Sequence, residues 1–193
     1  MDCRVLLAVR PPEEGKSRLA EALSATERFD LNNNMFRHVI SIICQVVPPA
    51  ALILVSRSEA LLEEARVRGA QVLAETGSDL NSALEQAARL AVEQGAGSLL
   101  SLSSDLPGLT PDDVRAMIEA PADIAIATDR FRRGTNALRM RPAGVIGFRY
   151  GGDSLAAHLA AAREARREAL VVDRPGLAND IDTPADLAEL RHG

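Results

Sequence analysis

The chain has 193 residues, 47% of them hydrophobic and 25% charged, with a formal net charge of −5. This length and composition predict a single domain, residues 1–193, with a full-sized core. The basic residues are scattered, which argues against sequence-independent nucleic-acid binding because that activity needs a basic surface. The sequence has no apolar run of bilayer length and starts with a strand-like run, so we expect neither a membrane span nor a signal peptide. Cys3 and Cys44 have no metal or redox spacing, which fits a reducing cytosol and predicts a cytoplasmic protein.

Short apolar runs alternate with helix-start signals over the first 120 residues. The runs predict strands at residues 4–9, 52–56, 71–73 and 98–102. Capping signals and helical periodicity predict helices at residues 25–46, 59–68, 80–94 and 111–120. This alternation predicts an α/β fold, a three-layer α/β/α sandwich with a mostly parallel central sheet.

Residues 123–148 contain three extended segments, at 124–127, 137–140 and 144–148, with no helix between them. We interpret them as a β-hairpin excursion inserted in the α/β frame. The stretch from Asp129 to Phe148 could form a pocket wall, the arm of a homodimer, or both. Beyond it, the sequence predicts a helix at 155–166, a strand at 170–173, a turn at 174–177 and a last helix after residue 183.

Three aspartates form the candidate metal site. Asp105 follows the run at 98–102, which places it at the carboxyl end of a central strand, where open α/β sheets bind their ligands. Asp180 and Asp182 are two residues apart, so an extended backbone points both to one face. Carboxylates that converge in this way predict a divalent-metal site. The alternative for Asp105 is a turn or helix-cap role; for the pair it is capping, which the residues that follow already supply for the last helix.

Two cations lie on the loop after the first strand. Lys16 and Arg18 are in positions where they can contact a triphosphate, but the loop lacks the glycine spacing of a P-loop. The alternative is a solvated loop with incidental charges. Asn81 lies in the first turn of a helix for which Asp79 is the expected N-cap, and its carboxamide suits a purine edge or a ribose hydroxyl.

The start of the helix at 155–166 is a candidate anion site. Gly151 and Ser154 open it with exposed backbone N–H groups suited to a phosphate or carboxylate. His158, on the same helix, is expected to pack rather than to bind a ligand. The three arginines at the start of the excursion, within residues 129–136, are interpreted as a solvated turn, with anion contacts as the alternative; they are Arg130, Arg132 and Arg133.

Several short segments, in order along nearly the whole chain, together resemble one family: the guanylyltransferases that make the activated precursor of the deazaflavin coenzyme F-420. The segments are Lys16-Ser17-Arg18-Leu19, Leu80 to Leu84, Ser104-Asp105-Leu106-Pro107, Gly134 to Leu138, Gly151 with Ser154 and His158, and Pro175 to Leu177 followed by Asp180 to Pro184. These enzymes act on 2-phospho-L-lactate or phosphoenolpyruvate. The resemblance implies a fold like that of nucleotide-diphospho-sugar transferases, the glycosyltransferase-A type.

The resemblance also implies roles for individual residues. Asp105, Asp180 and Asp182 would hold Mg²⁺, and Thr135, Gly151 and Ser154 would hold the phosphorylated acid. Lys16 and Arg18 would face the GTP phosphates, and together with Asp105 they form the expected catalytic set; Asn81 is added as a GTP contact from its position. Arg10 and Asp79 stand where the family usually carries lysine and glycine, which makes base and ribose recognition less certain.

The leading hypothesis is therefore an enzyme that transfers GMP from GTP to the phosphate of a three-carbon acid and releases pyrophosphate. The residues leave the acid open among phosphoenolpyruvate, 2-phospho-L-lactate and 3-phosphoglycerate. One alternative is a nucleotidyltransferase of another specificity, such as a molybdopterin guanylyl or cytidylyl transferase or a sugar-phosphate one. Another is a non-catalytic nucleotide-binding regulatory protein of the same fold.

Overall fold

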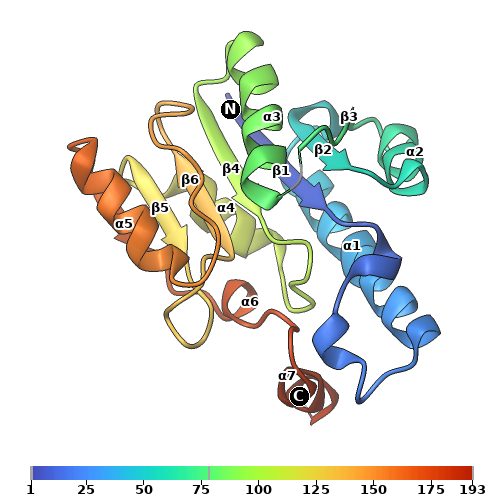
Figure 1. Cartoon of the computed structure of the whole chain (residues 1–193). Coiled ribbons are helices and arrows are strands. Elements are labelled where there is room, and N and C mark those ends of the chain that lie inside the picture. Colours follow the sequence, from blue (N-terminus) through green and yellow to red (C-terminus); the bar gives the residue numbers. More distant parts are fainter. Residues whose placement is uncertain (1, 78, 193) are drawn as a thin grey trace.

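The computed structural model describes residues 2–77 and 79–192, and within them seven strands form one sheet (Figure 1). The strands lie in the order β3-β2-β1-β4-β6-β5-β7. Neighbouring strands are parallel, except that β6 runs antiparallel to both β4 and β5. The predicted mostly parallel sheet is confirmed. The strands are β1 (Cys3–Val9), β2 (Leu52–Ser56), β3 (Gln71–Ala74), β4 (Ser98–Leu102), β5 (Ile124–Ala127), β6 (Ala137–Met140) and β7 (Ala169–Val171).

Helices cover both faces of the sheet and give the predicted three layers (Figure 1). The core clusters place α1, α2 and α4 on one face and α3 and α5 on the other. Short α6 and the C-terminal α7 lie near the end of the sheet at which β4 finishes. The helices are α1 (Ala25–Val46), α2 (Glu59–Val67), α3 (Leu80–Glu93), α4 (Pro111–Glu119), α5 (Ser154–Glu164), α6 (Pro175–Ala178) and α7 (Pro184–His192).

The strand sequences explain why both faces are covered. In β1, Val5 and Leu7 pack in the core under α1, α2 and α4, whereas Leu6 packs in the core under α3 and α5, because successive side chains of a strand point to opposite faces. Every residue of β2 and β4 is buried, as expected for central parallel strands between two helical layers. The sheet therefore presents a rigid edge from which loops can extend.

The predicted helix starts are confirmed. Ser24 accepts a hydrogen bond from Glu27 N, and the Glu27 carboxylate accepts one from Ser24 N. Thr110 and Asp113 form the same reciprocal pair at the start of α4. Asp79 caps α3, as expected from its position. A cap of this kind contributes about 1 kcal/mol, which fixes where each helix begins relative to the sheet.

The β-hairpin excursion is part of the sheet. Its two strands, β5 and β6, pair antiparallel and lie between β4 and β7. The extended segment expected at 144–148 was wrong: it forms no strand, and it follows Pro142, which lacks the N–H group a ladder needs. Ile146 and Phe148 are nevertheless buried in the core on the α3 side. The turn expected at 174–177 contains the short helix α6.

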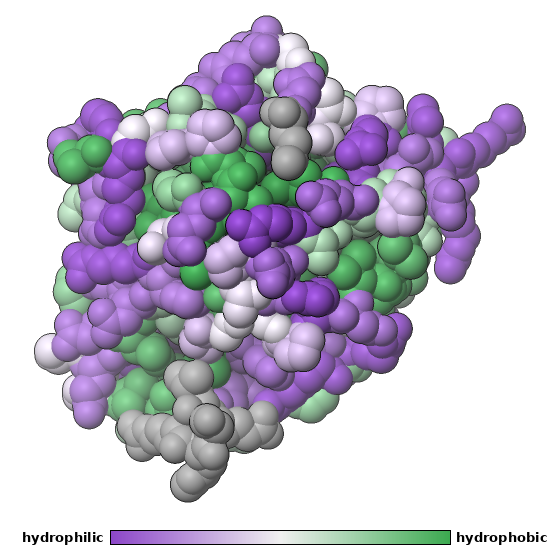
Figure 2. Space-filling model, turned by 180° about the vertical axis from the view of Figure 1, so that it is seen from behind, coloured by the Kyte–Doolittle hydropathy of each residue, from purple (hydrophilic) through white to green (hydrophobic). Residues whose placement is uncertain are grey.

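The surface seen from behind is mostly hydrophilic, with apolar side chains in smaller areas (Figure 2). The helix that is long enough to approach bilayer thickness, α1, buries one side in the core and carries polar residues elsewhere. Within residues 2–77 and 79–192, no helix combines the length and the apolar character needed to cross a membrane.

Candidate active site

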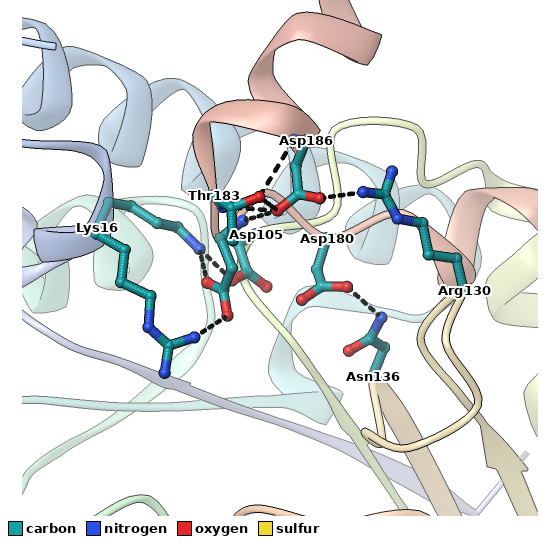
Figure 3. Close-up of polar contacts among 9 residues, drawn as sticks. Lys16, Asp105, Arg130, Asn136, Asp180, Thr183 and Asp186 are labelled. Atoms are coloured by element: carbon teal, nitrogen blue, oxygen red, sulfur yellow. Dashed lines mark hydrogen bonds and ion pairs between the residues drawn. The ribbon is translucent and has the colours of Figure 1, made fainter. Parts of the chain in front are cut away.

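The three predicted metal-binding acids come together beyond the carboxyl end of β4 (Figure 3). Asp105 lies on the loop after β4, and Asp180 and Asp182 lie between α6 and α7. One carboxylate oxygen from each lies within 4.8 Å of the other two. A hydrogen bond of 3.3 Å from Ile181 N to the Asp105 carbonyl oxygen joins the two segments. Ile181 is buried, so the expected alternation, with both acids on one face and the isoleucine on the other, is confirmed.

Lys16 reaches the same acids from the loop after β1. Its ammonium contacts Asp105 Oδ2 and lies 2.9 Å from Asp182 Oδ1. Burial alone would lower the pKa of Lys16, but the charges and hydrogen bonds of the two aspartates raise it above its usual value, so the side chain stays charged. Arg18 lies at the margin of the site: its Nη1 is 3.9 Å from Asp182 Oδ2, and its side chain is 75% exposed.

Asp180 is the acid whose negative charge is least balanced by neighbouring groups. Its Oδ1 accepts a hydrogen bond of 3.1 Å from Asn136 Nδ2, and among the described residues it forms no ion pair with a lysine or arginine. Burial raises the pKa of Asp180, the nearby Asp105 charge raises it further, and the hydrogen bond from Asn136 opposes both effects. Three oxygen-donor carboxylates that share one close ammonium leave excess negative charge, and a divalent cation with a preference for oxygen would balance it. The residues present therefore fit a hard metal ion such as Mg²⁺.

A second carboxylate network holds the acid pair in place. Asp186 Oδ2 accepts hydrogen bonds from Asp182 N at 2.9 Å and from Thr183 N at 2.6 Å, and its Oδ1 lies 2.5 Å from Arg130 Nη2 (Figure 3). Burial alone would raise the pKa of Asp186, but these bonds and the Arg130 charge lower it. The predicted start of the last helix is thus confirmed. The hydrogen bond from Asp182 N to Asp186 also fixes the backbone that carries Asp182.

Two of the residues expected at the acceptor side are brought together. Thr135 and Ser154 are both buried, and the Thr135 hydroxyl lies 3.0 Å from Nδ1 of His158, one turn along α5 from Ser154. A hydrogen bond of 3.0 Å from Leu155 N to the Arg133 carbonyl oxygen ties the start of α5 to the β5–β6 connection. His158 is packed, as expected.

Gly151 precedes α5 with φ = 145°, a conformation that side-chain-bearing residues rarely adopt. A Cβ built on it meets no atom within 4 Å, so the position combines an unusual backbone with open space.

Of the three arginines in the turn at 129–136, Arg130 and Arg132 form ion pairs with described residues of the fold. Arg130 pairs with Asp186, and Arg132 Nη1 lies 3.1 Å from Asp173 Oδ1 with both side chains exposed. Arg130 therefore supports the acid-bearing segment, a role that the sequence did not reveal.

A groove runs from the acids along the carboxyl ends of β1 and β4. Its main cavity has a volume of about 330 Å³, and a second hollow of about 260 Å³ continues it, because Ala8, Val9, Arg10 and Leu80 line both. The main cavity has apolar walls from α1 and α3 and polar atoms at its acidic end; its lining includes Lys16, Asn32, Met35, Phe36, Leu84, Ser104, Asp105 and Asp182. Apolar walls with a few convergent polar groups are typical of a nucleotide or other small-molecule site.

Asn81 has a different environment from that expected. Its Oδ1 accepts a hydrogen bond of 2.7 Å from Tyr150 N, and its Nδ2 donates one of 3.0 Å to the Tyr150 carbonyl oxygen. Tyr150 in turn lines the main cavity, and its hydroxyl lies 2.7 Å from Ser101 Oγ. Asn81 thus holds a wall of the groove, and a direct contact with GTP stays a prediction.

Comparison with known proteins decides the family. The family described as "Guanylyl transferase CofC like" matches residues 3–193. The chain belongs to this CofC-like guanylyl transferase family. It is 40% identical to the phosphoenolpyruvate guanylyltransferase of Rubrobacter xylanophilus over 191 residues, which cover 96% of this chain and 93% of the relative. It is 34% identical to the 3-phospho-D-glycerate guanylyltransferase of Colwellia psychrerythraea, covering 97% of this chain and 90% of the relative.

Solved structures agree on the fold of this family member. A candidate nucleotide-diphospho-sugar transferase from Desulfovibrio desulfuricans is similar with a TM-score of 0.76 at 23% identity, covering 98% of this chain and 86% of that one. A nucleotidyl transferase from Methanothermobacter is similar with a TM-score of 0.65 at 16% identity, covering 98% and 96%. The resemblance inferred from short segments is confirmed, and the chain is a nucleotidyltransferase.

The sequence missed the residues that support the site of this guanylyl transferase. Asn136, beside Thr135 in a segment that carries the resemblance, anchors Asp180 and also donates to the Leu177 carbonyl oxygen at 2.9 Å. Its position between a candidate ligand-binding threonine and a strand was the available signal. Arg130 carried no such signal, because its partner lies 56 residues away in the chain.

Proposed function

We propose that this guanylyl transferase moves GMP from GTP to the phosphate of phosphoenolpyruvate and releases pyrophosphate. A phosphate oxygen of the acceptor attacks the α-phosphorus of GTP, while the bond from that phosphorus to the bridging oxygen of the departing pyrophosphate breaks. The observation that carries the proposal is the meeting, at one end of a nucleotide-sized groove, of three carboxylates and a lysine. The family and the name of the relative at 40% identity support GTP and phosphoenolpyruvate as substrates.

Asp105, Asp180 and Asp182 would hold Mg²⁺. The ion would supply positive charge that offsets the charge of the triphosphate in the transition state. The protein contributes the arrangement of its ligands: Asp186 and Asn136 fix the segment that carries Asp180 and Asp182 through the hydrogen bonds described above.

Lys16 and Arg18 would donate to phosphate oxygens of GTP. Lys16 now bridges Asp105 and Asp182, and as a compact charge on a flexible stem it can remain near the acids while it contacts a phosphate. The purine would lie in the groove between α1 and α3, where Met35, Phe36 and Leu84 offer apolar contact. No protein nucleophile is needed, because the acceptor phosphate attacks directly.

Thr135, Gly151 and Ser154 would bind the three-carbon acid. Thr135 and Ser154 supply hydroxyl groups, and the start of α5 supplies backbone N–H groups, which favour an anion. Gly151, just before α5, has no side chain, and the space where its Cβ would lie is open.

The substrates are tested by mixing the protein with Mg²⁺, one nucleoside triphosphate and one acid, and measuring pyrophosphate release together with the mass of the product. GTP with phosphoenolpyruvate should react fastest. The other acids to be tested are 2-phospho-L-lactate and 3-phospho-D-glycerate. The second is included because a relative at 34% identity is named 3-phospho-D-glycerate guanylyltransferase. Faster turnover with another acid would change the acceptor, and faster turnover with CTP, ATP or UTP would contradict GMP transfer.

A further inference from the structure

His158 is fully buried, and each ring nitrogen has a different neighbour. Its Nε2 lies 2.9 Å from the backbone nitrogen of Arg149, and its Nδ1 lies 3.0 Å from the Thr135 hydroxyl oxygen. The ring also meets Tyr150 edge-on, with centroids 5.2 Å apart. The imidazole therefore has little freedom to turn, and its contacts connect α5, the segment after β6 and the β5–β6 connection.

The Arg149 contact decides which nitrogen carries the hydrogen. A backbone N–H group can only donate, so Nε2 must accept and carries no hydrogen. Burial lowers the pKa of His158 to about 4, a hydrogen bond with the Ser154 backbone opposes this, and the Arg149 charge lowers it further, so the ring is neutral near pH 7. A neutral imidazole has one ring hydrogen, which must then be on Nδ1.

The hydrogen on Nδ1 determines what the Thr135 hydroxyl can do. A protonated Nδ1 cannot accept a hydrogen bond. Toward Thr135 it can only donate, even while the Ser154 backbone shares its hydrogen, so the hydrogen of the hydroxyl itself is not used in that bond. Across the described part of the chain, the Thr135 hydroxyl has no further hydrogen-bond partner. With the opposite tautomer, the hydroxyl would donate to Nδ1 and offer only lone pairs to an approaching anion.

We infer that His158 is a positioning residue for the acceptor: by donating from Nδ1 to Thr135, it turns the threonine hydroxyl into a hydrogen-bond donor for the anionic group of the three-carbon acid. This inference rests on the proposed function of Thr135. His158 does not touch the substrate. Its contribution is to leave Thr135 one hydrogen to give, and the carboxylate or phosphate of the acid is the group that accepts it.

Two replacements of His158 separate positioning from packing. In His158→Asn the amide nitrogen can occupy the place of Nδ1 and keep donating to Thr135. In His158→Gln the amide falls near Nε2, where it can accept from Arg149 N but not donate to Thr135. We expect His158→Gln to raise the acceptor KM about tenfold to hundredfold, with the GTP KM unchanged, and His158→Asn to restore most of the loss. His38→Gln, which removes an imidazole that contacts the Leu109 carbonyl oxygen, is the matched control and should leave the acceptor KM unchanged.

Thr135→Val separates a failure of this inference from a failure of the proposed function. If Thr135→Val leaves the acceptor KM unchanged, Thr135 does not bind the acid and the proposed acceptor site is wrong. If Thr135→Val raises the KM but both His158 variants behave alike, the positioning role is wrong. In the Thr135→Val background, His158→Gln should raise the acceptor KM by less than about twofold, because the hydroxyl on which His158 acts is already gone.

The unmodified protein provides a test that no folding defect can obscure. A long-range ¹H–¹⁵N correlation spectrum distinguishes the protonated from the unprotonated ring nitrogen of each histidine. We expect His158 to be protonated on Nδ1 and bare on Nε2 at pH 7. A hydrogen on Nε2, or on both nitrogens, would overturn the inference.

Discussion

Lys16 is the only lysine in the sequence, although arginines are numerous. Its side chain is 8% exposed and lies between two acids that also form the candidate metal site. Arginine offers a rigid planar fork, whereas lysine offers a compact charge with three rotatable donors, which suits a group that must satisfy carboxylates and phosphates in one small space. The residue therefore connects the metal side and the nucleotide side of the groove.

Lys16→Ala should raise the GTP KM about tenfold to hundredfold and change the acceptor KM by less than about threefold, because the ammonium would contact phosphates of the nucleotide. Arg18→Ala is the matched comparison and should have a smaller effect, since its guanidinium is exposed. Steady-state kinetics with each substrate varied in turn measures both constants. Equal losses for both substrates would place Lys16 outside the nucleotide side of the site.

At the scale of elements, the start of α7 determines how Asp180 and Asp182 are presented. Asp186 accepts hydrogen bonds from the backbone of Asp182 and Thr183 and pairs with Arg130 from the β5–β6 connection. A helix cap thus also holds a ligand-bearing segment against another loop.

Asp186→Ala should weaken metal binding about tenfold to hundredfold without removing a metal ligand, because it releases the backbone that orients Asp182. Mn²⁺ binding followed by electron paramagnetic resonance measures the affinity. Asp112→Ala, at the start of α4 with its side chain 77% exposed, is the control. Equal Mn²⁺ affinity in the two variants would show that the network does not support the acids.

The packing of α5 on the sheet predicts a pH dependence of stability. The folded pKa of His158 is about 4 and its ordinary value is 6.5, so the unfolded chain binds the extra proton more readily. The stabilisation from the neutral ring is present above pH 6.5 and is lost as the pH falls toward 4, amounting to about 3 kcal/mol at most. Urea unfolding at several pH values should show a smaller loss between pH 7 and 4 in His158→Asn than in the unmodified protein. If the free energy of unfolding falls by the same amount between pH 7 and 4 in the two proteins, His158 is not a buried neutral ring.

For the whole molecule, periodicity and capping were enough to predict the layers, the order of the elements and the ends of most helices. Local signals were sufficient for these features, such as the Ser24–Glu27 pair and the short, mostly apolar runs of β2 and β4. The strand expected at 144–148 failed because apolar character alone does not distinguish a buried connection from a strand. The pairing of β6 with β4 joins segments that are distant in the chain, and no local sequence pattern predicts it.

The candidate site divides in the same way. The three acids could be predicted because their spacing and their place after a strand are local, and the structure brings them together. The supporting contacts from Asn136, His158 and Arg130 join residues 23 to 56 positions apart. The use of Asn81 to hold residue 150 likewise depends on tertiary packing, because α3 and the segment after β6 are distant in the chain.

Asp105, Asp180 and Asp182 are the proposed metal site for GMP transfer to a three-carbon acid. Single-turnover pyrophosphate release from GTP and phosphoenolpyruvate with Mg²⁺ tests this role when Asp182→Asn is compared with Asp112→Asn. Each variant removes one carboxylate charge at nearly constant volume, but only Asp182 lies in the candidate site. We predict at least about a hundredfold slower release in Asp182→Asn and an unchanged rate in Asp112→Asn. Near-normal release in Asp182→Asn, with the fold intact by circular dichroism, would show that the three acids are not the metal site of the reaction.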